Sequence, residues 1–270
     1  MRDRGGDPGR RRAKRADPDL TETLRLYAFN CGWFQCRPGY FVAGDEGDYL
    51  RGPVPSYLID HPKGRALFDS GMGVRYRRDL ETALPADKFG LQWFEGMDIA
   101  TRLKAIGIDP ASIDYVINSH LHIDHCGGNS HLPNATMIIQ RRELETARRN
   151  PEPGLYEAVD YDTGQPIRAI DGELDLFGDG TVRVVPTYGH TPGHQSVIVR
   201  LPSGEVLLAG DCCYTERNLD VMVLPRATVD LEQGLLTFGR LAKARAGGTR
   251  ILFGHDGKQW AKLRENAEFE

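Results

Sequence analysis

Residues 119–128, which read Ser-His-Leu-His-Ile-Asp-His-Cys-Gly-Gly, constrain this chain more than any other segment. Three histidines and a carboxylate lie there within six residues: His120, His122, Asp124 and His125. Alternate side chains of an extended backbone share a face, so we expect His120, His122 and Asp124 to point one way and His125 to approach from another direction. Imidazole and carboxylate are the ligands of zinc sites that keep an open position. The pattern favours a metal site over a solvated polar loop with capping histidines.

Other side chains that can bind a metal follow predicted strands elsewhere in the chain. The apolar run at residues 115–117 ends just before His120, and three more strands are followed in the same way, with His190 after residues 181–185, Asp211 after residues 205–209 and His255 after residues 250–253. Functional side chains commonly gather at strand ends on a rigid sheet, whereas a core histidine would lie inside a strand or on an apolar helix face. The sequence therefore predicts that four strands lead to one site.

The remaining apolar patterns predict further strands and helices. Strands are expected at residues 24–29, 54–60, 65–69, 136–139 and 195–201, and helices at residues 98–106 and 141–149 and from residue 231 onward. We interpret residues 141–149 as a charged, exposed helix. Residues 151–165 are expected to form a surface loop. Residues 31–52, rich in glycine and aromatic residues, are interpreted as a long loop packed over another part of the fold.

Composition sets broad limits on the class of protein. The 270 residues, 40% hydrophobic and 27% charged, suit one large or two small globular domains. No apolar stretch approaches the roughly 20 residues that a membrane span requires. Residues 1–16 carry seven Lys or Arg against two Asp, yet the net charge of the chain is −4, so the rest of the chain is acidic. An acidic body argues against a general nucleic-acid binder.

The chain begins with a basic segment. We interpret residues 1–22 as a disordered basic tail because of their Gly/Arg/Asp/Pro composition; binding to an anionic partner and a start codon upstream of the true one are the alternatives. No apolar segment typical of a secretory signal follows. The five cysteines are an odd number without metal-type spacing, which favours reduced thiols in a cytoplasmic protein. Cys126, Cys212 and Cys213 flank candidate ligands.

The candidate ligands lie in segments of recognisable sequence. They are Gly-His-Thr-Pro-Gly-His around His190, Gly-Asp-Cys-Cys-Tyr around Asp211 and Phe-Gly-His-Asp around His255. Together with residues 119–128, these segments resemble the metallo-β-lactamase superfamily from about residue 24 to the C-terminus. The resemblance implies an α/β fold in residues 23–270, an αββα sandwich of two mixed β-sheets flanked by helices, with a two-metal site at one edge of the sheets.

The same resemblance implies a role for each candidate ligand. His120, His122 and His190 correspond to the ligands of a first metal, Asp124, His125 and His255 to those of a second, and Asp211 to the bridge between them. The implied cofactors are two divalent ions, most often zinc. Asp69, in a Gly-bearing turn after an early hairpin, corresponds to a structural acid or one that orients a ligand histidine. His194 corresponds to a position that does not bind metal.

Within the superfamily the chain most resembles the N-acyl-homoserine lactonases. The matching segments are residues 119–128, Gly-His-Thr-Pro-Gly-His-Gln-Ser, and Asp211-x-x-Tyr214. In those lactonases the tyrosine points at the substrate carbonyl; the alternative for Tyr214 is a buried aromatic whose hydroxyl caps a loop. Ile123 stands where well-known members have an aromatic residue and is expected to contact substrate. Cys212 and Cys213 replace small residues.

The resemblance also implies a mechanism, in which a hydroxide bridging the two metals opens the lactone ring. Tyr214 and one metal would stabilise the carbonyl oxygen, and Asp124 would protonate the leaving alcohol as general acid. A glyoxalase II-like thioester hydrolase and a pyridoxolactonase-like enzyme share the ligand set and are the alternatives. A β-lactamase is disfavoured because Asp211, not a cysteine, occupies the bridging position. The expected partner is a small lactone, and homodimer formation is left open.

Overall fold

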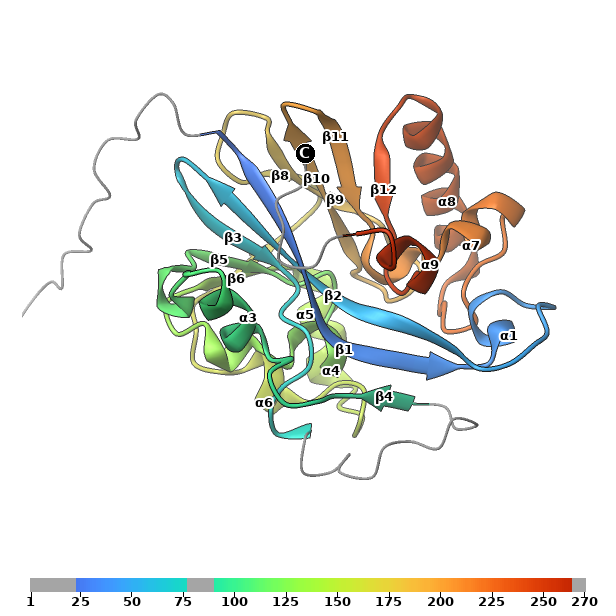
Figure 1. Cartoon of the computed structure of the whole chain (residues 1–270), viewed down its shortest axis with the longest axis horizontal. Helices are drawn as coiled ribbons and strands as arrows, with labels where there is room; N and C mark the ends of the chain where they lie inside the picture. Colours follow the sequence, from blue (N-terminus) through green and yellow to red (C-terminus); the bar gives the residue numbers. More distant parts are fainter. Residues whose placement is uncertain (1–22, 77–89, 264–270) are drawn as a thin grey trace, which may run out of the picture.

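The computed structural model describes residues 23–76 and 90–263, which form two β-sheets packed face to face (Figure 1). In spatial order the first sheet contains β4 (Gly90–Gln92), β1 (Arg25–Cys36), β2 (Leu50–His61), β3 (Gly64–Phe68), β5 (Tyr115–Ile117), β6 (Thr136–Gln140) and β7 (Ile167–Ile170). The second contains β12 (Arg250–Leu252), β11 (Gly204–Leu208), β10 (Gln195–Leu201), β9 (Val182–Pro186) and β8 (Leu174–Asp175). The predicted tail, residues 1–22, lies outside the described residues.

Helices cover the outer faces of both sheets. The α-helices are α1 (Pro38–Phe41), α3 (Ile99–Ala105), α4 (Ile123–Cys126), α5 (Arg141–Arg149), α6 (Ala158–Tyr161), α7 (Glu216–Val221), α8 (Leu231–Ala246) and α9 (Gly257–Trp260). Short 3₁₀ turns are η1 (Pro110–Ser112), η2 (Asn129–His131) and η3 (Gly210–Cys212). In the described ranges, none of these helices combines the length and the apolar character that a bilayer crossing needs.

Three apolar layers explain why the chain folds into a sandwich. Phe68 and Ile117 of the first sheet pack with Val199 and Leu208 of the second in the central core. Each such side chain contributes about 1.5–3 kcal/mol when it is fully buried. On the outer face of the first sheet, Leu103 of α3 and Leu144 of α5 pack in a second cluster. Phe238 and Leu241 of α8 pack on the outer face of the second sheet. The expected αββα sandwich is confirmed.

Both sheets are mixed, and their parallel strands end at matching levels. Parallel pairing sets Phe68 of β3 beside Ile117 of β5, and Leu208 of β11 beside Leu252 of β12. Because the carboxyl ends of parallel strands meet at one edge, the residues that follow these four strands are brought together. The prediction that four strand ends meet is therefore correct for β5, β11 and β12, and β9 reaches the same edge through the loop that carries His190.

Several local predictions were wrong. Residues 31–52 are not a long loop, because β1 continues to Cys36 past a register shift between Asn30 and Trp33, and α1 follows it. Pairing with β2 along the whole length supplies hydrogen bonds that the single-strand pattern did not predict. Residues 151–165 contain α6. Helix α5 is not wholly exposed, since Glu143, Leu144 and Ala147 are buried.

Candidate metal centre

The histidine-rich segment bends instead of running as a strand. Strand β5 ends at Ile117, and α4 begins at Ile123 with His122 as its N-cap residue. The expectation of an extended segment is therefore wrong: the backbone already bends at Ser119 and His120 and becomes helical at Ile123. The helical turn places Asp124 and His125 on successive positions of α4, and the loop before it carries His120 and His122. A bend allows four neighbouring side chains to reach one place from different directions, which a strand does not.

One group of candidate ligands consists of three buried histidines. Single ring nitrogens of His120, His122 and His190 all lie within 4.8 Å of one another. His190 Nε2 lies 3.3 Å from His122 Nδ1. His190 comes from the loop after β9, so this group joins the two sheets. Three imidazoles are a common protein ligand set for a catalytic zinc ion.

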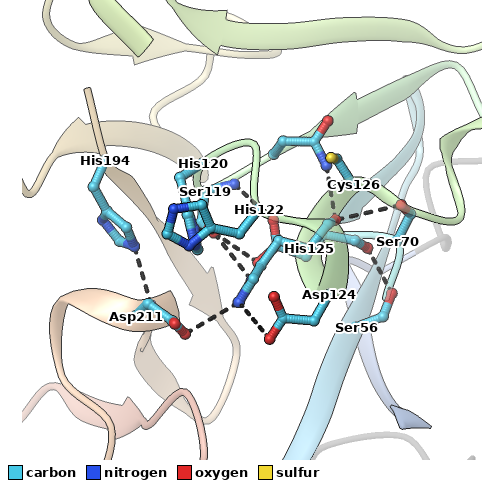
Figure 2. A network of polar contacts seen from close by, with 12 residues as sticks. Ser56, Ser70, Ser119, His120, His122, Asp124, His125, Cys126, His194 and Asp211 are labelled. Carbon is cyan, nitrogen blue, oxygen red and sulfur yellow. Dashed lines mark hydrogen bonds and ion pairs between the residues drawn. The ribbon is translucent and has the colours of Figure 1, made fainter. Parts of the chain in front are cut away.

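A second group lies beside the first and contains Asp124, His125 and His255. His125 Nε2 is 3.5 Å from Asp124 Oδ2, and His255 Nε2 is 4.0 Å from the same oxygen. Figure 2 shows Asp124 and His125 projecting toward Asp211 from α4. His255 follows β12, so the group again combines residues from both sheets.

Asp211 stands between the two groups. Its Oδ1 lies 3.2 Å from His125 Nε2 and 3.1 Å from His255 Nε2. Its Oδ2 lies 3.5 Å from His190 Nε2. The two oxygens of one carboxylate therefore face two different sets of histidines, which is the arrangement that a carboxylate shared by two metal ions requires.

The donor atoms fit a pair of cations. Within the described part of the chain, His120 Nε2, His125 Nε2 and Asp211 Oδ1 are buried without a hydrogen bond of good geometry. Buried polar atoms are normally paired, so atoms left unpaired together call for an ion or an ordered water. A set of imidazoles and carboxylates suits divalent ions such as zinc. Six of the seven predicted ligands make up the two groups, and the seventh, Asp211, lies between them.

The charge states of the two groups differ. Burial lowers the pKa of His122 to about 4 and that of His190 to about 3, and it lowers the pKa of His120 well below its usual value. Burial also lowers the pKa of His125 and His255, but the carboxylates of Asp211 and Asp124 outweigh it, so that both pKa values are raised. The three-histidine group is therefore neutral at pH 7, while the carboxylates of the second group favour the protonated form of its two histidines.

Asp69 contacts the second group through His125. Its Oδ2 lies 2.8 Å from His125 Nδ1, and its Oδ1 accepts a hydrogen bond of 2.6 Å from the Ser119 backbone N–H. Asp69 has a φ of 56°, a conformation that costs energy for a residue with a side chain. The turn after β3 thus holds the carboxylate under the histidine-rich segment.

His194 acts on Asp211 through the backbone. Its Nε2 accepts a hydrogen bond of 3.0 Å from the Asp211 N–H (Figure 2). Its Nδ1 lies 2.8 Å from Thr187 Oγ1, which continues to Ser196 Oγ at 2.7 Å. His194 Nε2 is occupied in this way, and within the described residues His194 is not in either of the two groups.

Tyr214 and Ile123 lie at the edge of the centre. The Tyr214 ring is 3% exposed and lies 4.9 Å from the ring of His255 and 5.9 Å from that of His190. Phe34 and Phe41 pack around it, so the segment interpreted as a loop does cover part of the site. Ile123 is buried in an apolar cluster with Val54, Met72, Tyr76, Trp93 and Met97.

Sequence reasoning missed one buried acid beside the centre, Glu143. Its side chain is fully buried on α5 and bonds to both histidine loops. The run of charges at residues 141–149 concealed it, because a charged helix is normally solvated. The same helix contains Leu144 and Ala147, and apolar residues three positions apart indicate a buried helix face. Glu143 lies next to that face, so its burial could have been inferred from this spacing.

The fold and the paired ligand groups define a class of protein, the metallo-β-lactamase superfamily, and residues 49–262 match this superfamily. The chain is 36% identical to the N-acyl homoserine lactonase AttM of Azorhizobium caulinodans, across 90% of this chain and 97% of that enzyme. It is 35% identical to the N-acyl homoserine lactonase of Bacillus cereus, across 79% of this chain and 85% of the relative.

A solved structure of an N-acyl homoserine lactone hydrolase, with the product N-hexanoyl-L-homoserine bound at its catalytic metal centre, superposes with a TM-score of 0.78. The identity is 30%, and the match covers 90% of this chain and 97% of that one. The chain therefore belongs to the N-acyl homoserine lactonase family of the metallo-β-lactamase superfamily.

Proposed function

We propose that this protein hydrolyses the lactone ring of N-acyl homoserine lactones at a site holding two zinc ions. The observation that carries the proposal is the placement of Asp211, whose two carboxylate oxygens face two separate ligand groups. Family membership and the product bound in the related hydrolase support the substrate class. The cytoplasmic location and the homodimer stay predictions.

Seven side chains would hold the two ions. His120, His122 and His190 would bind one, Asp124, His125 and His255 the other, and Asp211 both. Two divalent ions bound there would supply Lewis acidity and make a bound water acidic enough to attack at neutral pH. The neutral state of the three-histidine group at pH 7 suits ligand binding, since a protonated imidazole cannot coordinate.

The proposed role of Tyr214 is to donate a hydrogen bond to the lactone carbonyl oxygen. Burial and the carboxylate of Asp211 raise the pKa of its phenol, so that the hydroxyl keeps its proton across the neutral range. A neutral donor in a dry site stabilises the negative charge that develops on the carbonyl oxygen as water attacks. Phe34 and Phe41 exclude water from one side of the ring.

The proposed role of Asp124 is to move a proton. Burial raises the pKa of its carboxyl, but His125 and His255 outweigh this and lower it, so that the group is ionised at pH 7. Asp124 would accept the proton of the attacking water and then deliver it to the ring oxygen that leaves as an alcohol. It acts as general acid in the second step because it has acted as base in the first. Ile123, its neighbour, is proposed to contact the substrate.

A substrate screen with metal analysis tests the proposal. The purified protein, with its metals quantified, is assayed in a pH-stat with N-acyl homoserine lactones, simple lactones and S-lactoylglutathione. We expect about two divalent ions per chain and faster turnover of the homoserine lactones. Preference for S-lactoylglutathione would replace the proposal with the thioester hydrolase, and preference for simple lactones would replace the substrate while keeping the reaction.

A further inference from the structure

The carboxylate of Glu143 receives four hydrogen bonds and faces away from solvent. Oε1 accepts from the Leu121 N–H at 3.3 Å and from the Tyr156 hydroxyl at 3.0 Å. Oε2 accepts from the Thr191 hydroxyl at 2.7 Å and from the Gly193 N–H at 2.9 Å. Each oxygen therefore takes one backbone N–H and one side-chain hydroxyl.

These four donors belong to the two segments that carry the three-histidine group, and to a residue packed against it. Leu121 lies between His120 and His122 on the first sheet's side. Thr191 and Gly193 lie in the loop that begins at His190 on the second sheet's side. Glu143 is thus a single group that ties the two loops to each other.

The loop that follows His190 approaches α5 too closely to be adjusted easily. A side chain at Gly193 would place its Cβ 2.3 Å from the Glu143 backbone nitrogen, so only glycine fits. The Tyr156 ring, whose hydroxyl binds Glu143, lies 4.8 Å from the His122 ring in an edge-to-face arrangement. Contact with Glu143 therefore reaches His122 from two sides, through the backbone of Leu121 and through Tyr156.

A buried carboxylate needs a reason to persist. Removing an ionised group from water costs several kcal/mol unless its lone pairs are satisfied, and here four hydrogen bonds satisfy them. The two backbone N–H groups can only donate, so they fit an acceptor. Among the described residues Glu143 is in neither ligand group, and each of its oxygens already accepts two hydrogen bonds.

We propose that Glu143 is a positioning residue, which fixes His122 and His190 relative to each other and so sets the affinity of the three-histidine group for a divalent cation. The inference rests on the metal site of the proposed function and not on the lactone substrate. Partners of ligand histidines commonly alter metal affinity by about 10–100-fold when they are changed. Glu143 would do so while joining ligands from two sheets.

The test is Zn²⁺ affinity of the full chain, measured by competition with a chromophoric chelator and without any lactone. In Glu143→Gln the amide nitrogen would face one pair of donors, and that pair would lose its acceptor. Because these donors lie on or against the loops of the three-histidine group, Zn²⁺ binding should weaken at that group alone. We expect the dissociation constant of the three-histidine group to rise about 10–100-fold and that of the second group to change less than threefold; a rise confined to the second group would contradict the proposal. The matched control is Glu145→Gln, two residues along the same helix and exposed in its pair with Arg149; it should keep both constants.

Thr191 provides a second pair of variants should Glu143→Gln fail to fold. Thr191→Val loses the 2.7 Å hydrogen bond and should weaken the same constant, whereas Thr191→Ser keeps the hydroxyl and should restore it. Equal constants in Thr191→Val and Thr191→Ser would overturn the proposal. So would equal weakening of both sites in Glu143→Gln together with a lower melting temperature of the metal-free protein, since Glu143 would then act on the fold in general. Because the measurement uses no lactone, it still tests the role of Glu143 if the protein turns out to act on a different substrate.

Discussion

His125 Nδ1 lies 2.8 Å from Asp69 Oδ2, and this contact sets which nitrogen of the ring faces the metal centre. A histidine that gives its Nδ1–H to a carboxylate keeps Nε2 free to bind a cation. His125 Nε2 accordingly points toward Asp211 and Asp124, at 3.2 and 3.5 Å. The turn after β3, where Asp69 has a φ of 56°, therefore orients a candidate ligand of α4.

Replacing Asp69 with Asn should weaken the second metal. The amide cannot match the charge of the carboxylate beside His125, and loss of such a partner costs about 10–100-fold in metal affinity. The Ser119 hydrogen bonds to the side chain can largely remain, so the fold should survive. Elemental analysis after dialysis against a weak chelator checks this. Asp60→Asn, which alters a partly buried ion pair with Arg65, is the matched control and should retain both metals.

Tyr214→Phe should leave both metals bound and lower the rate of lactone hydrolysis. Removing one oxyanion donor costs roughly tenfold to a thousandfold in turnover. The loss should fall on kcat more than on KM, because the hydrogen bond strengthens as charge develops in the transition state. Steady-state kinetics with an N-acyl homoserine lactone measures the split. A variant with parent kinetics would make Tyr214 a packing residue only, and Tyr57→Phe, buried in the core, serves as the control.

The buried thiols should not react in the folded protein. Burial raises the pKa of Cys212 to about 12 and those of Cys126 and Cys213 well above their ordinary value. The thiolate is the reactive form, so iodoacetamide at pH 8 should leave these three thiols unmodified and activity intact. Mass spectrometry before and after unfolding gives the count. Rapid loss of activity in the folded protein, with one of them alkylated, would contradict this view of the site.

Most of the candidate ligand set could be picked out from the sequence because these residues lie in short segments with glycine or several histidines. Three of these residues each follow a strand and adjoin a glycine: His190, Asp211 and His255. The pairing of the strands brings their ends together, independently of the conformation of the intervening loops. Asp69 could be placed only as a turn acid, since the spacing of residues does not show which side chain a turn faces.

Two features depended on tertiary contacts and escaped prediction. The segment after β5 was predicted to be extended but forms α4, because other parts of the fold supply hydrogen-bond partners that the local alternation of residues does not reveal. The Ile123 N–H donates to the Leu155 carbonyl, and the Ser70 N–H donates to the His125 carbonyl. Glu143 escaped because a run of charges looks solvated, and only the loops packing on α5 bury it. Both cases show local pattern overruled by contacts far away in sequence.

Proton release should distinguish the two metal sites in the metal-free protein. The raised pKa values of His125 and His255 favour the protonated form of both rings relative to a free imidazole, and a ligand must be deprotonated before it binds a cation. Binding at the second group therefore competes with protons, and its affinity should rise as pH increases from 6 to 8. The three-histidine group starts neutral, because the pKa of His122 is about 4 and that of His190 about 3, and its affinity should be nearly flat over the same range.

Calorimetric titration of Zn²⁺ into the metal-free protein at pH 7, in buffers of different ionisation enthalpy, counts the protons released. We expect close to none for the three-histidine group and at least about one for the second, by the linkage of ligand protonation to binding. Asp69→Asn removes one of the carboxylates that raise the pKa of His125, so its second site should release fewer protons than that of the parent. Equal proton release at both sites in the parent protein would show that the buried carboxylates do not hold protons on His125 and His255.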